Sequence, residues 1–353
     1  MTIPPMRAAL GLGDGYHSPQ VEAAVRLNTN ESPFPPPAGW FAALQEELET
    51  VAWHRYPDRG AWALRKAVAD LHGVAPEQVW CANGSNEVLQ TLLLAYGGPG
   101  RAVAVWEPTY ALHSHIAELT GTAVATGSRG PDLALDPAEV RRLIDDARPT
   151  VTFLCSPNNP TGEAVDPDLV TDVLARAPGL TVVDEAYGQF SPTSAVDLVA
   201  NDRALVVTRT YSKTWSLAGL RLGYCIAPVE VVAAMERASL PYHLDTFTQL
   251  AGRLALRFVD AMEQRVSYVV EERGRLAAGL ADLPVEAWRS DANFILFRPL
   301  AGGGGDVWQG LLDRSILVRN CDSWPHLADC LRVTVGTAEE NDAFLRALAE
   351  VLA

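Results

Sequence analysis

Residues 209–224 read Arg-Thr-Tyr-Ser-Lys-Thr-Trp-Ser-Leu-Ala-Gly-Leu-Arg-Leu-Gly-Tyr and follow an apolar run that is typical of a buried strand. Thr210 and Ser212 supply hydroxyl groups and Arg221 supplies a planar cationic fork, and such groups suit an anionic phosphate. Lys213 lies between them in the chain. A partly desolvated lysine beside an arginine has a lowered pKa and becomes nucleophilic, so we expect Lys213 to do chemistry.

Lysine is scarce in this chain. Only two of the 28 basic residues are lysines, Lys66 and Lys213, and all the others are arginines. Arginine cannot act as an amine nucleophile, because its guanidinium stays protonated. Lys66 belongs to the amphipathic pattern Trp62–Asp70 and is expected on a solvated helix face. For Lys213, a structural alternative is that it caps a strand end while Arg221 forms an ion pair.

Composition limits the classes of function. The chain has 353 residues, of which 48% are hydrophobic, and a net charge of −15. This is enough to bury one large core, or one large and one small domain. We expect no nucleic-acid partner, because nucleic-acid binding needs a basic stripe. The chain shows no apolar stretch of membrane-spanning length and no apolar signal core, which predicts a cytoplasmic protein that does not bind membranes. Five widely spaced cysteines without a Cys-x-x-Cys motif predict neither a disulfide framework nor a metal site.

Strands and helices alternate between residues 60 and 230, which predicts a mostly parallel α/β sheet. The predicted strands are Gln78–Ala82, Ala102–Trp106, Val151–Cys155, Thr181–Val183, Ala204–Thr208 and Gly223–Ile226. The predicted helices include Ser85–Tyr96, Tyr110–Thr120, Pro137–Asp146, Asp166–Ala177, Val229–Ser239 and Thr248–Leu280. Mixed strands and helices from residue 285 onward predict a smaller α+β domain, and Gly302–Gly305 is predicted to be a surface loop.

Two other predicted strand ends carry polar groups. Ser-Pro-Asn-Asn-Pro-Thr-Gly at 156–162 is a rigid turn whose asparagine amides are available to a ligand. Asp184 ends an apolar strand, where a partly desolvated carboxylate needs a cationic partner. The structural alternatives are a simple turn and a helix cap. Ligands of open α/β sheets bind beyond the carboxyl ends of the strands, so these groups are expected to meet Lys213.

Two further segments complete a candidate ligand site. Asn-Gly-Ser-Asn-Glu at 83–87 opens a predicted helix, and the free N–H groups of such a helix end bind anions. Tyr110 follows another strand and would stack on a flat ring. Together with Asp184 for a ring nitrogen and Lys213 for an aldehyde, these groups predict a planar ligand that carries a phosphate, a basic ring nitrogen and an aldehyde.

Four motifs, in their order along the chain, resemble those of the fold-type I, pyridoxal-phosphate-dependent aminotransferases of class II. They are Asn159-Pro-Thr-Gly162, Asp184 with Tyr187, Ser212-Lys213 and Arg221. The resemblance implies pyridoxal 5'-phosphate as cofactor and an α/β fold with a large, mostly parallel seven-stranded domain and a smaller α+β domain. The expected boundaries are 1–45 for an N-terminal segment that joins the small domain, 46–265 for the large cofactor-binding domain and 266–353 for the small domain.

Within this family the chain resembles the histidinol-phosphate aminotransferases. The supporting runs lie at residues 27–33, 55–57, 156–162, 217–223, 240–244 and 331–337. This resemblance implies transamination of L-histidinol phosphate with 2-oxoglutarate in histidine biosynthesis. The alternative is an aromatic amino-acid aminotransferase on the same scaffold. A non-catalytic pyridoxal-phosphate regulator and a decarboxylase of similar fold are weaker alternatives.

The resemblance also implies roles for single residues. Lys213, Asp184 and Tyr187 would be catalytic, with Lys213 attached to the cofactor aldehyde and Asn159 and Tyr187 bound to the ring oxygen. Ser85 and Asn86 would offer backbone N–H groups to the cofactor phosphate, which Thr210, Ser212 and Arg221 would share.

Other implied roles concern the substrate and a second subunit. Tyr56 would reach the cofactor phosphate of the other subunit, which implies a homodimer. Arg332 would bind a substrate carboxylate and Arg319 the substrate's own phosphate. Tyr16 and Asn30 would belong to an N-terminal segment that closes the site.

The chain departs from the family at two positions. Family members often have an acid where Asn86 stands, which matters little if only its backbone binds. A smaller aromatic is common where Trp215 stands, so Trp215 is expected to reshape a pocket wall.

Overall fold

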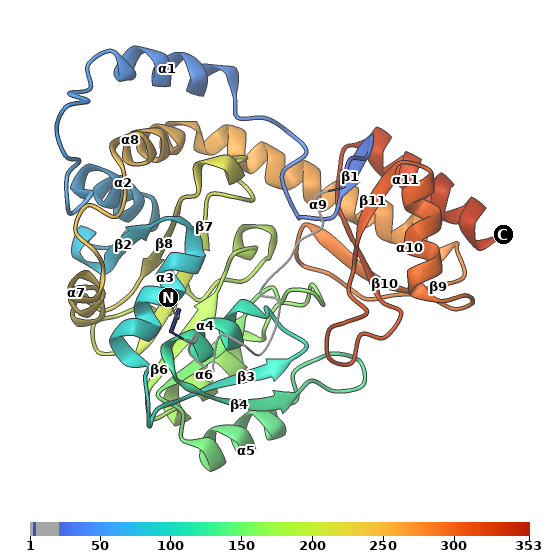
Figure 1. The fold of residues 1–353 in the computed structure, drawn as a ribbon, viewed down its shortest axis with the longest axis horizontal. Helices are drawn as coiled ribbons and strands as arrows, with labels where there is room; N and C mark the ends of the chain where they lie inside the picture. Colours follow the sequence, from blue (N-terminus) through green and yellow to red (C-terminus); the bar gives the residue numbers. More distant parts are fainter. Residues whose placement is uncertain (1–2, 5–20) are drawn as a thin grey trace.

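The structure is a computed structural model that describes residues 3–4 and 21–353. Its larger sheet has seven strands in the order β2-β8-β7-β6-β5-β3-β4. All neighbouring strands are parallel except β8, which runs antiparallel to both β2 and β7. The predicted mostly parallel α/β sheet is thus confirmed (Figure 1). The strand bounds are β2 Val79–Ala82, β3 Ala102–Glu107, β4 Ala123–Ser128, β5 Val151–Cys155, β6 Leu180–Asp184, β7 Leu205–Thr210 and β8 Gly223–Ile226.

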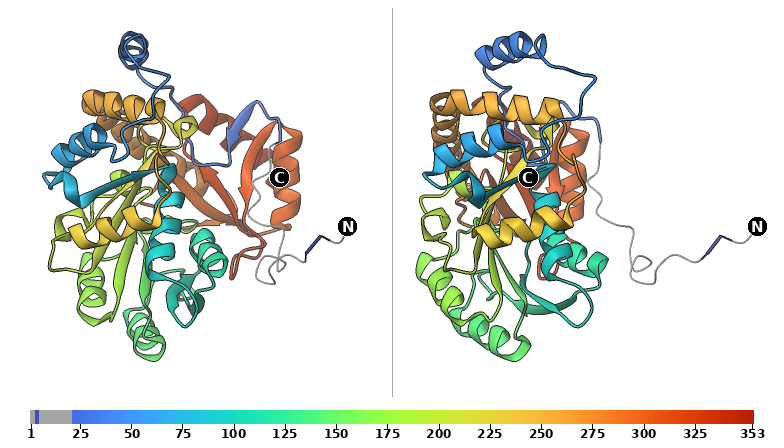
Figure 2. Two further views of the ribbon diagram at one scale, coloured as in Figure 1. Left: turned by 60° about the vertical axis from the view of Figure 1, so that its left-hand side comes forward. Right: turned by 90° about the vertical axis from the view of Figure 1, so that its left-hand side faces the viewer.

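Helices cover both faces of this sheet (Figure 2). One face packs against α3, α4 and α7 through one hydrophobic cluster, and the other packs against α2, α5, α6 and α8 through a second. The central strands β5 and β6 are buried along their whole length, as expected for parallel strands covered on both faces. The helices span α2 Trp62–His72, α3 Gly84–Tyr96, α4 Leu112–Thr120, α5 Pro137–Ala147, α6 Pro167–Arg176, α7 Val229–Ala238 and α8 Thr246–Ala255.

A second sheet of five strands, in the order β1-β11-β12-β10-β9, lies near the C-terminus with its own hydrophobic core. β1 (Val25–Leu27) comes from the N-terminal part of the chain and pairs in parallel with β11 (Ile316–Asn320). The other strands are β9 Val285–Ala287, β10 Phe294–Pro299 and β12 Leu331–Thr334, and the helices are α10 Gly304–Asp313 and α11 Ala338–Leu352.

Two helices connect the parts of the molecule. α1 (Ala38–Leu48) packs on α8, where the Trp40 indole Nε1 donates to the Ala251 carbonyl at 3.0 Å. α9 (Val259–Ala281) is 23 residues long and runs from the large sheet's helices to the small sheet (Figure 1). The proposed boundaries at 45/46 and 265/266 therefore fall inside α1 and α9.

The predicted loop at residues 302–305 is wrong at Gly304 and Gly305, which are helical, whereas residues 302 and 303 are not in a helix. α10 begins at Gly304, whose N–H donates to the Asp329 carboxylate at 2.7 Å. A Cβ on Gly304 would lie 2.4 Å from the Asp329 carbonyl oxygen. Gly304 thus allows a close approach of two backbones at the start of the helix.

Candidate active site

One pocket of about 230 Å³ collects nearly every predicted site residue at the carboxyl ends of β5, β6 and β7. This is the edge of the sheet where ligands of open α/β folds bind. Its lining includes Asn30, Ser85, Asn86, Tyr110, Asn159, Asp184, Tyr187, Thr210, Ser212, Lys213, Arg221, Arg319 and Arg332. Asn28, Thr29, Cys155 and Ala186 line it as well, and the sequence had not indicated these four.

Lys213 reaches into the pocket from the loop after β7. Its Nζ donates to the Thr29 carbonyl at 2.9 Å and lies 5.7 Å from the centre of the Tyr187 ring. Loss of hydration, followed by the positive charge of Arg332, lowers the pKa of Lys213 from 10.5 to about 7. Arg221 acts in the same direction as Arg332, while Glu31 opposes them. A large fraction of Lys213 is therefore a neutral, nucleophilic amine at neutral pH.

Asp184 lies at the end of β6 and is 1% exposed. Its Oδ1 accepts from the Thr208 hydroxyl at 3.0 Å and from the Ala186 N–H at 3.2 Å. Its Oδ2 lies 3.0 Å from Nε2 of His113, whose ring stacks on Phe153 with centroids 4.7 Å apart. These contacts fix the carboxylate in one orientation toward the pocket.

Sequence reasoning missed His113. It lies in the first turn of α4, two strands away from Asp184 in the sheet, so only the tertiary structure brings the two together. The one available signal was a histidine three residues after Tyr110, but His115 in the same helix offers an equal signal. The Tyr110 hydroxyl donates to Oδ1 of Asn86 at 3.0 Å, which orients the ring that was predicted to cover the ligand.

The groups that the sequence predicted to bind a phosphate lie together at one end of the pocket. The Ser212 hydroxyl is 3.0 Å from that of Thr210 and 3.3 Å from Nη1 of Arg221. The N-terminus of α3 adjoins them, because a Cβ on Gly84 would lie 2.8 Å from Nη2 of Arg221 and one on Gly223 only 2.3 Å from a backbone nitrogen in the first turn. Hydroxyls, a guanidinium and a helix N-terminus form an anion site.

The opposite end of the pocket presents two arginines from adjacent strands of the small sheet. Arg319 on β11 and Arg332 on β12 are paired in register. Arg332 donates to Oδ1 of Asn159 and to the Asn28 carbonyl, while its Nε is buried without a partner. Arg319 lies over the Trp324 ring at 6.0 Å. Two cations side by side favour a doubly charged anion.

Asn30 fastens the segment after β1 to this site. It is 1% exposed, and its Nδ2 donates to the Tyr187 hydroxyl at 3.0 Å. Its backbone N–H donates to the Thr334 hydroxyl at 3.0 Å, and its carbonyl accepts from Nδ2 of Asn293 at 3.1 Å. The predicted closing segment is therefore held by hydrogen bonds at Asn30, whereas Tyr16 lies outside the described residues.

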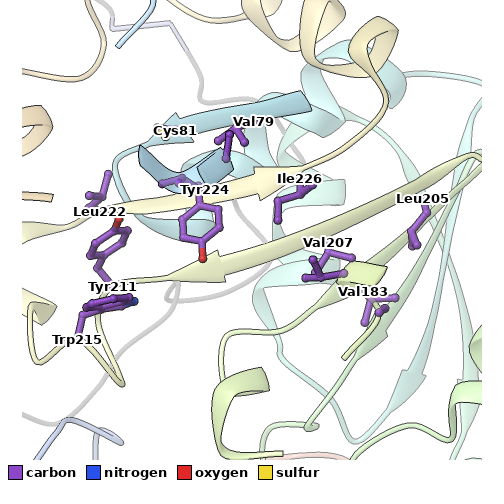
Figure 3. Packing of buried hydrophobic residues seen from close by; sticks show 14 of the residues in the cluster. Val79, Cys81, Val183, Leu205, Val207, Tyr211, Trp215, Leu222, Tyr224 and Ile226 are labelled. Carbon is purple, nitrogen blue, oxygen red and sulfur yellow. The ribbon is translucent and has the colours of Figure 1, made fainter. Parts of the chain in front are cut away.

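Two aromatic residues do not line the pocket. Tyr56 is 81% exposed and stacks on Tyr242 with ring centroids 4.7 Å apart. Trp215 was expected to reshape a pocket wall, and this was wrong. Its ring packs against Tyr211 in the hydrophobic core of the large sheet and is 4% exposed (Figure 3).

The donor set fits pyridoxal phosphate. The pocket contains an anion site around Arg221, the buried carboxylate of Asp184 and the amine of Lys213, whose pKa is lowered. These groups correspond to the phosphate, the ring nitrogen and the aldehyde.

The sheet order and this constellation define a fold-type I, pyridoxal-phosphate-dependent enzyme. The chain belongs to the family described as aminotransferase class I and II, which matches residues 22–348. It is 44% identical to a histidinol-phosphate aminotransferase of Frankia casuarinae, over 99% of this chain and 90% of that protein. It is also 44% identical to a histidinol-phosphate aminotransferase of Streptomyces avermitilis, over 98% of this chain and 96% of that protein.

Solved structures show the same fold. A histidinol-phosphate aminotransferase of Sinorhizobium meliloti, in complex with pyridoxal-5'-phosphate, superimposes with a TM-score of 0.88 at 20% identity and covers 99% of this chain and 98% of its own. An aspartate aminotransferase of Thermus thermophilus superimposes with a TM-score of 0.81 at 24% identity, over 94% of this chain and 92% of its own. Within residues 3–4 and 21–353, no helix is long and apolar enough to cross a membrane, and no His, Cys, Asp or Glu group could hold a metal ion.

Proposed function

We propose that this aminotransferase transfers the amino group of L-histidinol phosphate to 2-oxoglutarate, forming imidazole acetol phosphate and glutamate in histidine biosynthesis. Curated relatives between 41% and 44% identical over nearly the whole chain carry the name histidinol-phosphate aminotransferase. None of those relatives carries the name of the alternative, an aromatic amino-acid aminotransferase.

The charge of the pocket carries this proposal. Its lining holds three arginines, the partly neutral Lys213 and a single carboxylate, although the chain as a whole has a net charge of −15. The cofactor phosphate would bind at one cationic end of the pocket, where Arg221 lies. Arg319 and Arg332 form the other, which suits a substrate phosphate in one half-reaction and the carboxylates of 2-oxoglutarate in the other.

The residues that would hold the cofactor follow from the geometry. Ser85 and Asn86 on α3, with Thr210, Ser212 and Arg221, would bind its phosphate.

The remaining cofactor contacts would surround its ring. Tyr110 would cover the ring, Asn159 and Tyr187 would bind its oxygen, and Asp184 would hold a proton on its nitrogen. The cofactor, when bound, supplies an aldehyde for the substrate amine and a ring that accepts the electrons of the deprotonated α-carbon.

Lys213 would first anchor the cofactor and then transfer protons. Its pKa of about 7 allows the freed amine to take the proton of the substrate α-carbon and later to donate it. The Thr29 carbonyl, 2.9 Å from Nζ, accepts one N–H and leaves the lone pair of the neutral amine free for this step. Arg332 would bind the anionic group of the substrate.

Donor profiling tests the proposal. With 2-oxoglutarate as acceptor, kcat/KM for histidinol phosphate should exceed that for phenylalanine, tyrosine and tryptophan by roughly 100-fold, because charge-assisted hydrogen bonds to a phosphate contribute about 1.5–3 kcal/mol each. Equal or faster turnover of an aromatic amino acid would replace the proposal by the alternative.

We also propose a cytoplasmic homodimer in which Tyr56 reaches the partner's cofactor phosphate. Tyr56 is 81% exposed, and Trp53, Leu240 and Tyr242 around it are 60%, 78% and 43% exposed. A cluster of large exposed apolar side chains marks an interaction surface. The five cysteines are free and buried, as suits a reducing compartment.

A hybrid dimer tests the shared site. Tyr56→Phe and Lys213→Ala are each expected to lose activity. If Tyr56 acts across the interface, a hybrid of the two variants contains one site with both defects and one intact site. Each hybrid dimer should then have up to about half of the wild-type activity, and a random mixture about a quarter. If mixing restores nothing while hybrids form, Tyr56 acts within its own chain.

A further inference from the structure

A second cavity lies outside the active site. It has a volume of about 400 Å³, which falls in the range of small-molecule sites. The chain after β4, the chain between β5 and α6, the turn at Pro192 and Thr193 and the segment before β10 form its walls. In Figure 1 the chain that leaves β4 extends toward the small sheet, so this cavity lies where the two parts of the molecule meet.

Arg129 lies in this cavity without an ion-pair partner among the described residues. It is 8% exposed, its Nη1 donates only to the Leu133 carbonyl at 3.2 Å, and its Nε is buried without any hydrogen bond. Burial lowers the pKa of Arg129 to about 10. A buried guanidinium normally has a carboxylate beside it, because an unpaired buried charge is costly.

Glu163 lines the same cavity and is half-buried. Its carboxylate forms no hydrogen bond or ion pair with another described residue, and burial raises its pKa. Arg129 and Glu163 attract each other, yet they are too far apart to form an ion pair. The cavity thus keeps two opposite charges separated, each without an ion-pair partner among the described residues.

The neighbouring charges are already engaged. Asp291 accepts from the Arg289 guanidinium at 3.3 Å and from the Ala164 N–H at 3.3 Å, and its own N–H donates to the Gly162 carbonyl at 2.7 Å. Asp166, at the rim, caps α6. Arg129 and Glu163 therefore remain as the charged groups of the described lining that form neither an ion pair nor a helix cap.

Most of the rest of the lining is apolar. It includes Leu135, Pro137, Val165, Leu169 and Pro192. Several of these side chains belong to the core that supports β5 and α6, so the wall is preformed. A ligand for this cavity must carry a negative end, a positive end and an apolar body.

We propose that this cavity binds a free α-amino acid with an apolar side chain. Its carboxylate binds Arg129, its ammonium group binds Glu163, and its side chain packs on the apolar wall. The site is separate from the active-site pocket and does not depend on which amino donor the enzyme uses. Its occupant bridges the chain after β4 and the chain that carries Asn159.

Isothermal titration of the holoenzyme with L-leucine tests this site. We expect millimolar or tighter binding, about −4 kcal/mol or better, with one site per chain and no change in the absorbance of the bound cofactor. 4-Methylpentanoate, which lacks the ammonium group, and 3-methylbutylamine, which lacks the carboxylate, should bind at least about tenfold more weakly, because each leaves one buried charge unpaired.

Variants assign the binding to these residues. Glu163→Gln and Arg129→Met should each weaken leucine binding at least about tenfold while kcat/KM for the amino donor stays within about twofold. Glu163→Gln is nearly isosteric and half-buried, so it is decisive if Arg129→Met destabilises the fold. Arg289→Gln, at the rim, is the matched control and should bind leucine normally.

Three outcomes overturn the proposal. The first is no binding of L-leucine, L-methionine or L-phenylalanine at about 10 mM. The second is binding that Glu163→Gln leaves unchanged. The third is binding that always changes the cofactor absorbance, which assigns the amino acid to the active site. Failure of these tests leaves the transaminase activity itself untouched.

Discussion

Replacing Lys213 by methionine should stabilise the cofactor-free protein at neutral and lower pH. Methionine keeps most of the aliphatic stem but removes the amine, whose pKa falls from 10.5 to about 7 on folding. This drop corresponds to at most about 5 kcal/mol, at about 1.4 kcal/mol per pH unit. Because the amine faces a pocket that water enters, and because its hydrogen bond to the Thr29 carbonyl is also lost, we expect roughly half of that.

The direction of this pH dependence follows from how many protons the folded and unfolded states bind. Between pH 7 and 10.5 the unfolded chain holds a proton on Lys213 that the folded protein has released, so the stability of the wild type rises with pH across this window. Lys213→Met lacks this rise. The stability gained by the variant should therefore be full below about pH 7 and vanish toward pH 10.5.

Urea unfolding of both cofactor-free proteins between pH 6 and 10 measures this difference. Lys66→Met is the matched control, because Lys66 is 68% exposed in its side chain and pairs only with Asp70 on the surface. That substitution should change the free energy of unfolding by about 1 kcal/mol or less at every pH. Parallel pH profiles for wild type and Lys213→Met would refute the inference that burial lowers the pKa of this amine.

Three further predictions concern the pocket. Gly223→Ala should weaken pyridoxal phosphate binding at least about tenfold by fluorescence titration, since its Cβ would lie 2.3 Å from a backbone nitrogen of α3. Gly219→Ala, with open space around its Cβ, should not. His113→Phe should lower kcat/KM about 10- to 100-fold, because Oδ2 of Asp184 loses its 3.0 Å partner; unchanged turnover would make His113 merely structural. Arg319→Met should raise KM for histidinol phosphate about 10- to 100-fold and affect aromatic donors less, as steady-state kinetics can show.

The strand-end chemistry was predictable because it is local in sequence. Each polar group directly follows an apolar run, and parallel strands place their carboxyl ends at one edge. Asn159, Asp184 and Lys213 therefore meet in one pocket as expected. The edge strand β4 was missed, because most of its residues are partly exposed and its apolar pattern is weak.

Features that depend on tertiary packing were not predictable. His113 meets Asp184 only because α4 crosses the sheet, and no spacing in the sequence encodes that contact. Trp215 was expected at a pocket wall because a smaller aromatic is common at this position in the family, but the chain turns at Ser216, which has a φ of 58°. That turn directs the indole into the core instead.

Because the chain has only two lysines, reagents that react with lysine amines can modify only two side chains of this protein. Lys66 on α2 stands in solvent, and Lys213, the other lysine of the chain, lies inside the pocket. A support that couples through lysine would hold every molecule by α2, in a single orientation. Acylation of Lys213, followed by mass spectrometry, would in turn count the sites that are open and free of cofactor.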